Sequence, residues 1–413
     1  MLKKSFIFFL LLYLNYSFSQ TKFLRKYFKQ EFYSHFLVGF SLYDTQNKKF
    51  IFQQNADTYF IPASNTKNFT LFQSYEKRKD SIISLKYFER KDTLYITGTG
   101  DPTFLHPKIN NRKVIDFLKN QNKPIVLYYQ KLAQNYGNGW SIDDYFQAYS
   151  AEISSFPIYG NVITIDNNKV TPDYFTPYVT FNSKIENRLL DKNIFTYKEN
   201  TTLAFKTSDT LTQKLLEKEI GKKIHLTNTN VFLNNINVRN LKTIPYETVL
   251  EEMQKKSNNF FAEHLQMLNC ENNELEKCNC QTNRDSLLVK ILGKKNRARW
   301  EDGSGSSRYN LFTPNQNIVV LNHLYTANNF DELKDYFAIN GQYGSLINDL
   351  KDEKPFIYAK TGSFGNTYNL SGFLLADSGK IYIFSFMNNH FMVKNSEVKL
   401  KVFELLKKIK EKY

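Results

Sequence analysis

The pattern of predicted secondary structure changes twice along the chain, and these two changes constrain the fold more than any other feature of the sequence. Short β-like runs separated by Asn, Asp, Lys and Gly turns fill residues 86–242, whereas longer apolar strands and amphipathic helices fill the parts before and after. We therefore expect one mixed α/β (α+β) domain, assembled from residues 20–85 and 243–413. A mostly β accessory domain, inserted at residues 86–242, interrupts it.

The first and last parts of the chain supply the strands of the mixed domain. The apolar runs at residues 36–43 and 50–52 flank a polar turn and predict a hairpin. Near the C-terminus, residues 355–363 predict a strand, and residues 368–376 and 380–387 predict a second hairpin. The strands of a hairpin are antiparallel, so we expect an antiparallel sheet.

Helical periodicity predicts helices at residues 23–32, 64–75, 247–268 and 317–325. The last segment of the chain carries apolar residues at helical spacing, with lysines on the other face: Val398, Val402, Leu405, Leu406 and Ile409. A helix that covers a sheet explains this pattern, and a helix that lies on a membrane surface is the alternative.

The composition is that of a globular protein. Hydrophobic residues make up 41% of the 413 residues, with only 16 Gly and 10 Pro, which excludes disordered, collagen-like and low-complexity classes. The formal net charge of +15 is compatible with attraction to polyanions, but the Lys-rich surfaces of soluble proteins produce the same excess. We expect no specific nucleic-acid binding.

Residues 1–19 have the three parts of a signal peptide. Lys3 and Lys4 precede an apolar stretch at residues 5–14, and residues 17–19 have the small-x-small pattern of a cleavage site. An uncleaved anchor is the alternative, although the apolar stretch is short for the roughly 20 residues of a membrane-spanning helix. No later segment has the apolar length to span a bilayer, so we expect an exported mature chain without a transmembrane segment.

The three cysteines, Cys270, Cys278 and Cys280, lie in one short polar stretch. In an exported chain this clustering predicts one local disulfide. A metal site that includes His264 is the alternative, but the Cys-x7-Cys-x-Cys spacing is not a standard zinc pattern. We expect neither a metal nor a cofactor.

The pattern Ser-x-x-Lys occurs four times, and its context singles out Ser64 and Lys67. This pair follows Pro62, which is well placed at the start of a helix. Side chains three residues apart share one face of a helix, so the amine of Lys67 is expected beside the hydroxyl of Ser64. Chance is the alternative, because the chain is rich in lysine.

A second motif, Ser257-Asn258-Asn259, is the only Ser-x-Asn in the chain and begins a helical run. Taken alone, it is also explained by an ordinary helix N-cap, since Ser and Asn are favoured there.

A third motif, Lys360-Thr361-Gly362-Ser363, occurs once, at the end of an apolar strand. Its glycine admits the close approach of a backbone or a ligand, and its lysine can hold a carboxylate. An edge lysine followed by a strand bulge is the alternative.

Together and in this order, the three motifs are those of β-lactamases and penicillin-binding proteins. Further phrases narrow the resemblance, at residues 62–67, 100–103, 140–144, 257–263, 302–305, 307–311 and 359–363. From Val38 to Asn389 the chain resembles the D-alanyl-D-alanine carboxypeptidase/endopeptidase family of the penicillin-binding protein 4 type, peptidase family S13. This resemblance implies a β-lactamase/transpeptidase-like domain with an antiparallel sheet flanked by helices. Two residues depart from the family pattern: Asn258 stands where Asp is usual, and Ser306 where an apolar residue is usual.

The resemblance implies acyl transfer through a serine ester. Ser64 would attack the carbonyl of the penultimate D-alanine of a stem peptide, with Lys67 as the base. Ser257 and Asn259 would relay a proton to the leaving amine and orient Lys67 and the substrate amide. Water would then hydrolyse the ester.

By the same resemblance, Lys360 and Thr361 would bind the terminal carboxylate of the substrate. The backbone N–H groups of Ser64 and Ser363, beside Gly362, would form the oxyanion hole.

Asp144 would meet the side-chain amine of a dibasic stem-peptide residue; a surface acid or a cap is the alternative. The expected partners are peptidoglycan stem peptides in the periplasm and β-lactams as covalent inhibitors. Two other functions fit the same fold, a β-lactamase and a non-catalytic protein that binds the cell wall.

Overall fold

The computed structural model describes residues 21–77, 79–109, 111–181, 193–197, 200–269 and 280–413. The predicted signal peptide, Cys270, Cys278 and the side chain of Cys280 lie outside the described residues, as does the predicted disulfide. The chain divides into two compact units. Unit 1 comprises Met1–Phe69, Val289–Arg299 and Asn310–Tyr413, and unit 2 comprises Thr70–Leu288 and Trp300–Tyr309.

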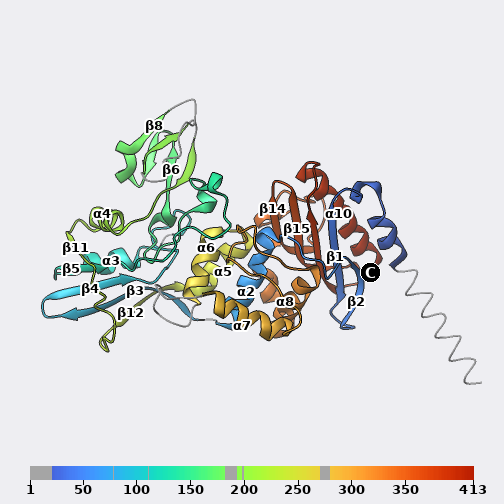
Figure 1. Cartoon of the computed structure of the whole chain (residues 1–413), viewed down its shortest axis with the longest axis horizontal. Helices are drawn as coiled ribbons and strands as arrows, with labels where there is room; N and C mark the ends of the chain where they lie inside the picture. Colours follow the sequence, from blue (N-terminus) through green and yellow to red (C-terminus); the bar gives the residue numbers. More distant parts are fainter. Residues whose placement is uncertain (1–20, 78, 110, 182–192, 198–199, 270–279) are drawn as a thin grey trace, which may run out of the picture. The chain divides into compact units, whose positions relative to one another are not determined.

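Unit 1 is built on one six-stranded sheet, in which all neighbouring strands are antiparallel (Figure 1). The strands follow the order β13 (Ala338–Ile339), β14 (Ile357–Phe364), β15 (Thr367–Leu375), β16 (Ile381–Asn389), β1 (Leu37–Asp44) and β2 (Lys49–Gln54). The expected antiparallel sheet and both predicted hairpins are therefore confirmed. The central pairing joins the two ends of the chain, since Leu37 of β1 lies opposite Asn389 of β16.

One face of this sheet is covered by the helix at residues 21–28 and by α10 (Asn395–Lys412). Leu24 and the sheet residue Phe40 belong to the same buried core as the apolar residues of α10. Every apolar residue that the sequence pattern placed on the buried face of α10 is 0% exposed: Val398, Val402, Leu405, Leu406 and Ile409. Apolar burial of this kind is what holds a terminal helix on a sheet.

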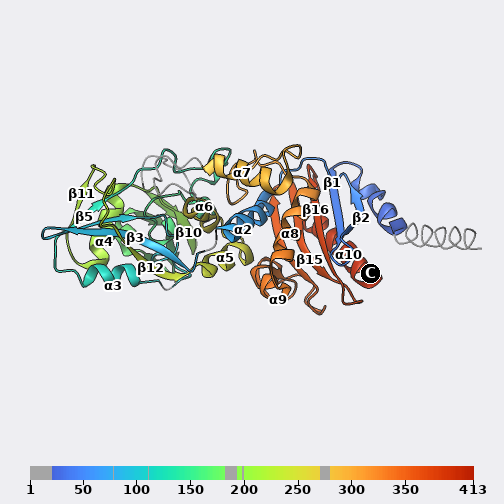
Figure 2. The same cartoon turned by 90° about the horizontal axis from the view of Figure 1, so that it is seen from below.

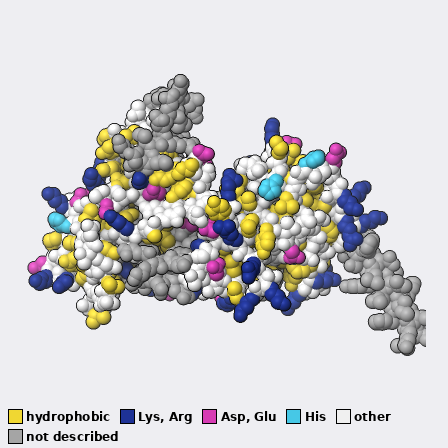
Figure 3. All heavy atoms as spheres, viewed as in Figure 1, with side chains coloured by type: hydrophobic (Ala, Val, Ile, Leu, Met, Phe, Trp, Pro, Cys, Tyr) yellow, Lys and Arg dark blue, Asp and Glu magenta, His cyan; other side chains and the backbone are white. Residues whose placement is uncertain are grey.

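The polar face of α10 forms ion pairs within unit 1. Lys399 lies 2.7 Å from Asp349, and Lys410 lies 3.1 Å from Asp377. Figure 3 shows the Lys and Arg side chains on the surface of both units, rather than on this helix alone. The helix covers the sheet, as the first of the two explanations of its pattern predicted.

The other helices of unit 1 include those that lie against the opposite side of the sheet. They are α8 (Pro314–Ala327), which packs against β1 and β16, and the short α9 (Phe330–Leu333), which follows it. Ile318 and Leu321 of α8 are buried. Two further helices, α2 (Lys67–Glu76) and α7 (Cys280–Leu292), contain residues of both units.

Unit 2 contains a five-stranded mixed sheet (Figure 2). Its order is β11 (Ile224–Thr227), β5 (Ile125–Tyr128), β4 (Thr93–Gly98), β3 (Ser81–Arg90) and β12 (Arg239–Pro245). The first three strands are parallel neighbours, and the last three are antiparallel neighbours. Smaller sheets are formed by β10 (Thr201–Ala204), β6 (Val162–Asp166) and β7 (Lys169–Thr171), and by β8 (Val179–Phe181) and β9 (Phe195–Tyr197).

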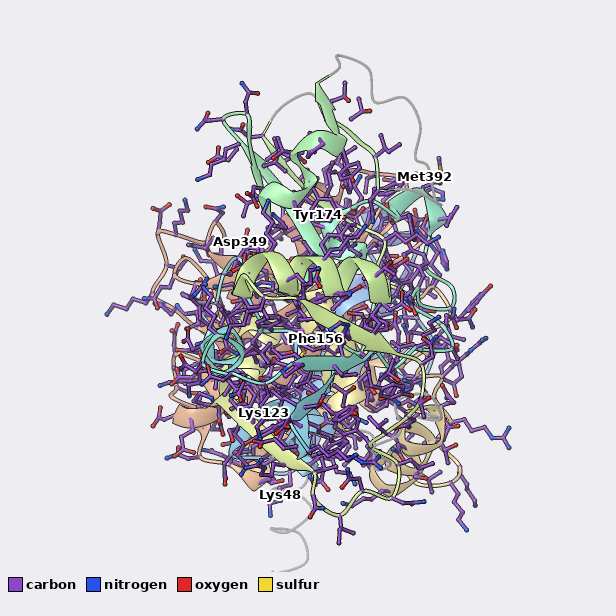
Figure 4. All side chains as sticks on the ribbon, turned by 90° about the vertical axis from the view of Figure 1, so that its left-hand side faces the viewer. Lys48, Lys123, Phe156, Tyr174, Asp349 and Met392 are labelled. Atoms are coloured by element: carbon purple, nitrogen blue, oxygen red, sulfur yellow. The ribbon has the colours of Figure 1, made fainter. Side chains whose placement is uncertain are left out.

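Two helices of unit 2, α3 (Lys113–Lys119) and α4 (Asp209–Ile220), share a buried core with the five-stranded sheet. Phe156, labelled in Figure 4, belongs to this core. Neither helix was expected among the short β-like runs. The signal for α4 was present, because Ser208 accepts a hydrogen bond from Leu211 as its N-cap, and Gly221 ends the helix with a positive φ of 71°.

The predicted helix at residues 247–268 is two helices, α5 (Tyr246–Lys255) and α6 (Asn259–Leu268). The break falls on the Ser-x-Asn motif, where Ser257 has a positive φ of 59° and cannot continue a right-handed helix. In the described part of the chain, none of the helices has the length and apolarity needed to cross a membrane.

Truncation of α10 tests its role as the cover of the sheet. We expect Leu405→Ala to lower the free energy of unfolding of unit 1 by about 2–5 kcal/mol, because it opens a cavity in a fully buried site. Leu400→Ala is the matched control on the same helix; its side chain is 71% exposed, and we expect a change below about 0.5 kcal/mol. Urea denaturation followed by far-ultraviolet circular dichroism measures both. Equal losses in the two variants would contradict this packing.

Candidate active site

Ser64 and Lys67 lie in contact at the junction of two helical segments in unit 1. Ser64 lies on a short 3-10 helix, η2 (Ala63–Thr66), and Lys67 begins α2, three residues later than the sequence predicted for this helix. With three residues per turn, a 3-10 helix brings side chains i and i+3 into register. The Nζ of Lys67 accordingly donates a hydrogen bond of 2.9 Å to the Oγ of Ser64.

The side chain of Lys67 is buried, that of Ser64 is half-buried, and the backbone before Ser64 is strained. Lys67 is 0% exposed. Ala63, immediately before Ser64, has a positive φ of 47°, which is costly for a residue with a side chain. Such strain persists where the surrounding structure fixes the backbone, and it is common at functional sites.

Asn65 fixes η2 to the sheet of unit 1. Its Nδ2 donates to the backbone oxygen of Lys360 at 2.9 Å, and its Oδ1 accepts from the Oγ of Ser371 at 2.6 Å. Asn65 is itself 0% exposed. A buried amide with both ends bonded holds the turn of Ser64 against β14 and β15.

Lys360 and Ser371 belong to a polar row that crosses four strands of the sheet. In register, Lys360 lies opposite Ser371, Ser371 opposite Ser385, and Ser385 opposite Ser41. All four residues are 0% exposed. The alternation of a strand places this row on the face opposite to Ala359, which packs in the apolar core.

The amine of Lys360 is buried and is hydrogen-bonded to the backbone. Its Nζ donates to the backbone oxygen of Thr361 at 2.8 Å. Burial lowers the pKa of Lys360 well below its usual range, and the positive charge of Lys67 lowers it further. The two lysines are therefore close enough to feel each other's charge.

The three residues after Lys360 differ in their surroundings. The Oγ1 of Thr361 donates to the Oγ of Ser345 at 2.8 Å, and Ser363 is exposed, with its Oγ accepting from Asn395 at 3.0 Å. Gly362 packs directly against η2, because a Cβ at this position would lie 2.6 Å from the backbone oxygen of Pro62. Only glycine permits this approach. Unit 1 thus brings Ser64 and Lys67 together with the Lys-Thr-Gly motif.

In unit 2, the Ser-x-Asn motif begins α6. The N-cap is Asn258, whose Oδ1 accepts from the backbone N–H of Phe261 at 3.2 Å. Asn258 therefore explains the capping signal in the sequence. Asn259, the next residue, donates from its Nδ2 to the backbone oxygen of Tyr149 at 3.0 Å and to the Oγ of Ser306 at 3.1 Å.

Both departures from the family pattern thus have a structural role. Asn258 caps α6 in the position where Asp is usual. Ser306, in place of an apolar residue, binds Asn259 and also accepts from the Oγ of Ser304 at 2.9 Å.

Asp144 lies near the same motif within unit 2. It ends a short 3-10 helix, η3 (Ile142–Asp144), and accepts from the hydroxyl of Tyr149 at 2.7 Å. The backbone oxygen of Tyr149 is in turn bound by Asn259. One tyrosine therefore connects Asp144 to Asn259.

A buried carboxylate pair, Glu263 and Asp302, holds the loop that carries Ser306. Glu263 accepts from the backbone N–H of Ser304 at 2.7 Å and of Gly303 at 3.2 Å. Asp302 accepts from the indole of Trp140 at 2.8 Å. Burial raises the pKa of Glu263, and the Asp302 carboxylate raises it further.

His264, the histidine of the alternative metal site, is enclosed in unit 2. Its Nδ1 lies 2.8 Å from the backbone oxygen of Phe260, and its Nε2 accepts from the backbone N–H of Ser154. Among the described residues, no group of three or more His, Cys, Asp or Glu side chains has the arrangement of a metal site.

Sequence reasoning assigned no role to several residues that order these motifs: Asn65, Tyr149, Glu263, Asp302 and Ser306. Asn65 and Glu263 carried a weak signal. Each is a polar residue within a segment that carries one of the motifs, Asn65 in residues 62–67 and Glu263 in residues 257–263. Tyr149 carried none, and Ser306 was noted only as a departure from the family pattern, because their contacts with Asn259 join positions far apart in the chain.

Glu263 makes a testable contribution to the pH dependence of stability. Its pKa rises from 4.5 to about 7 on folding, so the folded state binds more protons than the unfolded state between these values. We expect the stability that Glu263 contributes to fall as the pH rises from about 4.5 to about 7. The measurement is the difference in unfolding free energy between the wild type and Glu263→Gln across this range, which cancels the titration of other groups.

Glu251→Gln is the matched control, because this glutamate is exposed on α5. At pH 7, Glu263→Gln should also cost about 1–3 kcal/mol, since its amide cannot accept both backbone N–H groups. A Glu263→Gln difference that does not change with pH would contradict the raised pKa.

Comparisons with known proteins bear on the family and the fold of the chain. The family model described as the D-Ala-D-Ala carboxypeptidase 3 (S13) family matches residues 20–408. D-alanyl-D-alanine carboxypeptidase DacB of Haemophilus influenzae is 32% identical over 158 residues, which are 35% of this chain. The match spans 32% of that relative, about a third of its length.

Two solved structures are similar in fold. Penicillin binding protein 4 of Haemophilus influenzae has a TM-score of 0.69 at 21% identity, over 88% of this chain and 92% of that one. A predatory endopeptidase of Bdellovibrio bacteriovorus, acylated with penicillin G and in complex with an immunity protein, has a TM-score of 0.53 at 17% identity, over 90% and 92% of the two chains. The expected α/β fold of the transpeptidase-like type is confirmed. With a family model that matches nearly its whole length, the chain belongs to the D-Ala-D-Ala carboxypeptidase 3 (S13) family.

Proposed function

We propose that this protein is a serine-type D-Ala-D-Ala carboxypeptidase/endopeptidase that acts on peptidoglycan stem peptides through an acyl-enzyme. One observation carries the proposal: the buried amine of Lys67 donates to the hydroxyl of Ser64 at 2.9 Å. A serine needs a base within hydrogen-bond reach to become a nucleophile, and this geometry supplies one. A protein that only binds the cell wall has no need of such a pair.

In the acylation step, the Oγ of Ser64 attacks the carbonyl carbon of the penultimate D-alanine, and Lys67 in its neutral form takes the proton. The C–N bond breaks, and the leaving amine of the last residue receives a proton. Lys67 is fully buried, and removal from water favours the neutral form of an amine, which this step needs. Water then attacks the ester, and Ser64 recovers its proton.

Lys360 and Thr361 are the proposed receptor for the terminal carboxylate. A carboxylate beside Lys360 favours its charged form and so reverses the lowering of its pKa. The backbone N–H groups of Ser64 and Ser363 are the proposed oxyanion hole, which the close approach at Gly362 supports. The loss of one such donor costs about 3 kcal/mol of barrier.

The order of the motifs along the chain supports a role for unit 2 residues in the same reaction. Ser257 and Asn259 relay a proton to the leaving amine and orient the substrate amide. The hydrogen bonds of Asn259 to Tyr149 and Ser306 hold its amide in one orientation. Asp144 recognises the side-chain amine of a dibasic residue in the stem peptide.

The signal-like residues 1–19 support export to the periplasm, where the substrate lies. The domain organisation that we propose places the reaction in residues 20–85 and 243–413, with residues 86–242 as an accessory domain. A β-lactam mimics the D-Ala-D-Ala bond and acylates Ser64; the penicillin-acylated relative from Bdellovibrio bacteriovorus supports this step.

Intact-mass measurement after incubation with benzylpenicillin tests the nucleophile. We expect the mature protein to gain the mass of one penicillin, and Ser64→Ala to gain none. Ser396→Ala is the matched control, because Ser396 belongs to another Ser-x-x-Lys in unit 1 and is exposed; it should be acylated like the wild type. An adduct that persists for minutes supports the peptidase, rapid turnover of penicillin indicates a β-lactamase, and intact penicillin with no adduct overturns the catalytic proposal.

Gly362→Ala tests the close approach of β14 to η2. The new Cβ would lie 2.6 Å from the oxygen of Pro62 and 2.9 Å from the nitrogen of Asn65, so the strand must shift away from Ser64. Because misplacement by about 1 Å costs roughly 100-fold in rate, we expect acylation by benzylpenicillin to slow by about that factor. Gly365→Ala, where a Cβ meets nothing within 4 Å, should leave the rate unchanged. An unchanged rate in Gly362→Ala would contradict the proposed role of this glycine.

A further inference from the structure

Unit 2 contains a cavity of about 490 Å³ that the proposed reaction does not use. It lies against β3, β4, β5 and β12 of the five-stranded sheet and under the segment at residues 230–238. Every residue that lines it belongs to unit 2. A cavity of this size is within the range of small-molecule sites.

The floor of the cavity is a polar row across the sheet. Asn240 of β12 lies opposite Lys86 of β3, and Lys86 lies opposite Thr97 of β4. The preceding residues on these strands, Leu85 and Ile96, are buried in the apolar core, so alternation directs the polar row to the opposite face. That face carries the cavity, which α5 and α6 also line through Tyr246, Met267 and Leu268.

Thr97 gives an independent sign of a ligand. Its side chain is 5% exposed, and its Oγ1 has no hydrogen-bond partner in the described structure. A buried hydroxyl without a partner costs about 1–3 kcal/mol. Because Thr97 lines the cavity, a ligand polar atom in the cavity can satisfy it.

The charge of the cavity is positive. Lys79 and Lys86 line it, and none of its described lining residues is Asp or Glu. Burial lowers the pKa of both lysines, and the charge of Lys79 lowers that of Lys86 further. An anion in the cavity would relieve both effects, since it favours the charged amines.

The remaining wall combines aromatic rings with side-chain amides. The rings of Tyr128 and Phe232 lie 6.3 Å apart at 29°, and Phe88 packs edge-on against Phe232 at 5.0 Å. The amides of the lining are Gln130, Asn230, Asn234, Asn235 and Asn240. Aromatic faces, amides and cations together suit a ligand with sugar or peptide groups and a carboxylate.

We propose that this cavity binds a carboxylate-bearing glycopeptide fragment of the cell wall, with its carboxylate at Lys86 and a polar atom at Thr97. The proposal rests on the proposed function for the source of the ligand, but it concerns a second site that performs no bond cleavage. Such a site holds the enzyme on acidic wall material and raises the local concentration of substrate at the reacting residues.

Isothermal titration calorimetry with the full mature chain carrying Ser64→Ala tests this site. The titrant is the disaccharide-dipeptide GlcNAc-MurNAc-L-Ala-D-Glu, which has no D-alanine and therefore no bond for the proposed reaction. We expect binding that weakens at least about tenfold in Lys86→Gln, since a charge-assisted hydrogen bond is lost. Thr97→Val, which removes only the hydroxyl, should weaken it severalfold.

Two controls separate a specific site from general charge attraction. Lys169→Gln removes an exposed positive charge of unit 2 outside the cavity and should bind like the parent. The same titrant with both D-glutamate carboxyls converted to amides should bind at least about tenfold more weakly. If Lys86→Gln fails to fold, as judged by its melting temperature, Thr97→Val and the amidated titrant still decide.

Three results would overturn the proposal: no binding of the acidic titrant at millimolar concentration, equal binding by Lys86→Gln and Lys169→Gln, or equal affinity for plain acetate. The proposed function is tested by a separate result, since it fails if no penicillin adduct forms at Ser64. Binding in the cavity is measured with a variant and a titrant that cannot form that adduct.

Discussion

The burial of two lysine amines in one neighbourhood is the constraint on which unit 1 depends. Lys67 and Lys360 are both 0% exposed, and like charges repel strongly where water is excluded. Burial is the larger cause of the lowered pKa of Lys360, and the positive charge of Lys67 lowers it further. A bound anion relieves this repulsion, and so does the loss of a proton from one of the two amines. This energetic cost is compatible with the two proposed roles, a general base at Lys67 and a carboxylate receptor at Lys360.

The sheet of unit 1 keeps these amines in place through polar groups that it buries in register. Ser371 binds both Asn65 and Ser385, so a hydrogen-bonded path runs from the turn of Ser64 into the centre of the sheet. A buried polar network is stable only when its members are satisfied, which ties the position of the turn to the pairing of the strands. The geometry of the candidate site therefore depends on the same strand pairing that forms the sheet.

The strands and the terminal helix could be predicted from the sequence because their signals are local. Apolar alternation and spacing suffice for the hairpins and for α10. The break between α5 and α6 was not predicted, because the periodicity continues across it while Ser257 turns the backbone and Asn258 caps the next helix. Asn65 and Ser371 are separated by 306 residues in the sequence, and Asn259 and Ser306 by 47 residues. No local sequence pattern indicates hydrogen bonds over such separations.

The pairing of β1 with β16 also governs how the chain reaches this structure. Leu37 of β1 lies opposite Asn389 of β16. One edge of β1 can therefore form its backbone hydrogen bonds only after nearly the whole chain is present. Contacts so distant in sequence make folding slow, and an unpaired apolar strand can join other chains in the meantime. Synthesis from the N-terminus therefore exposes β1 to aggregation until the C-terminal strands emerge, and a chain truncated before residue 381 lacks the strand that would cover it.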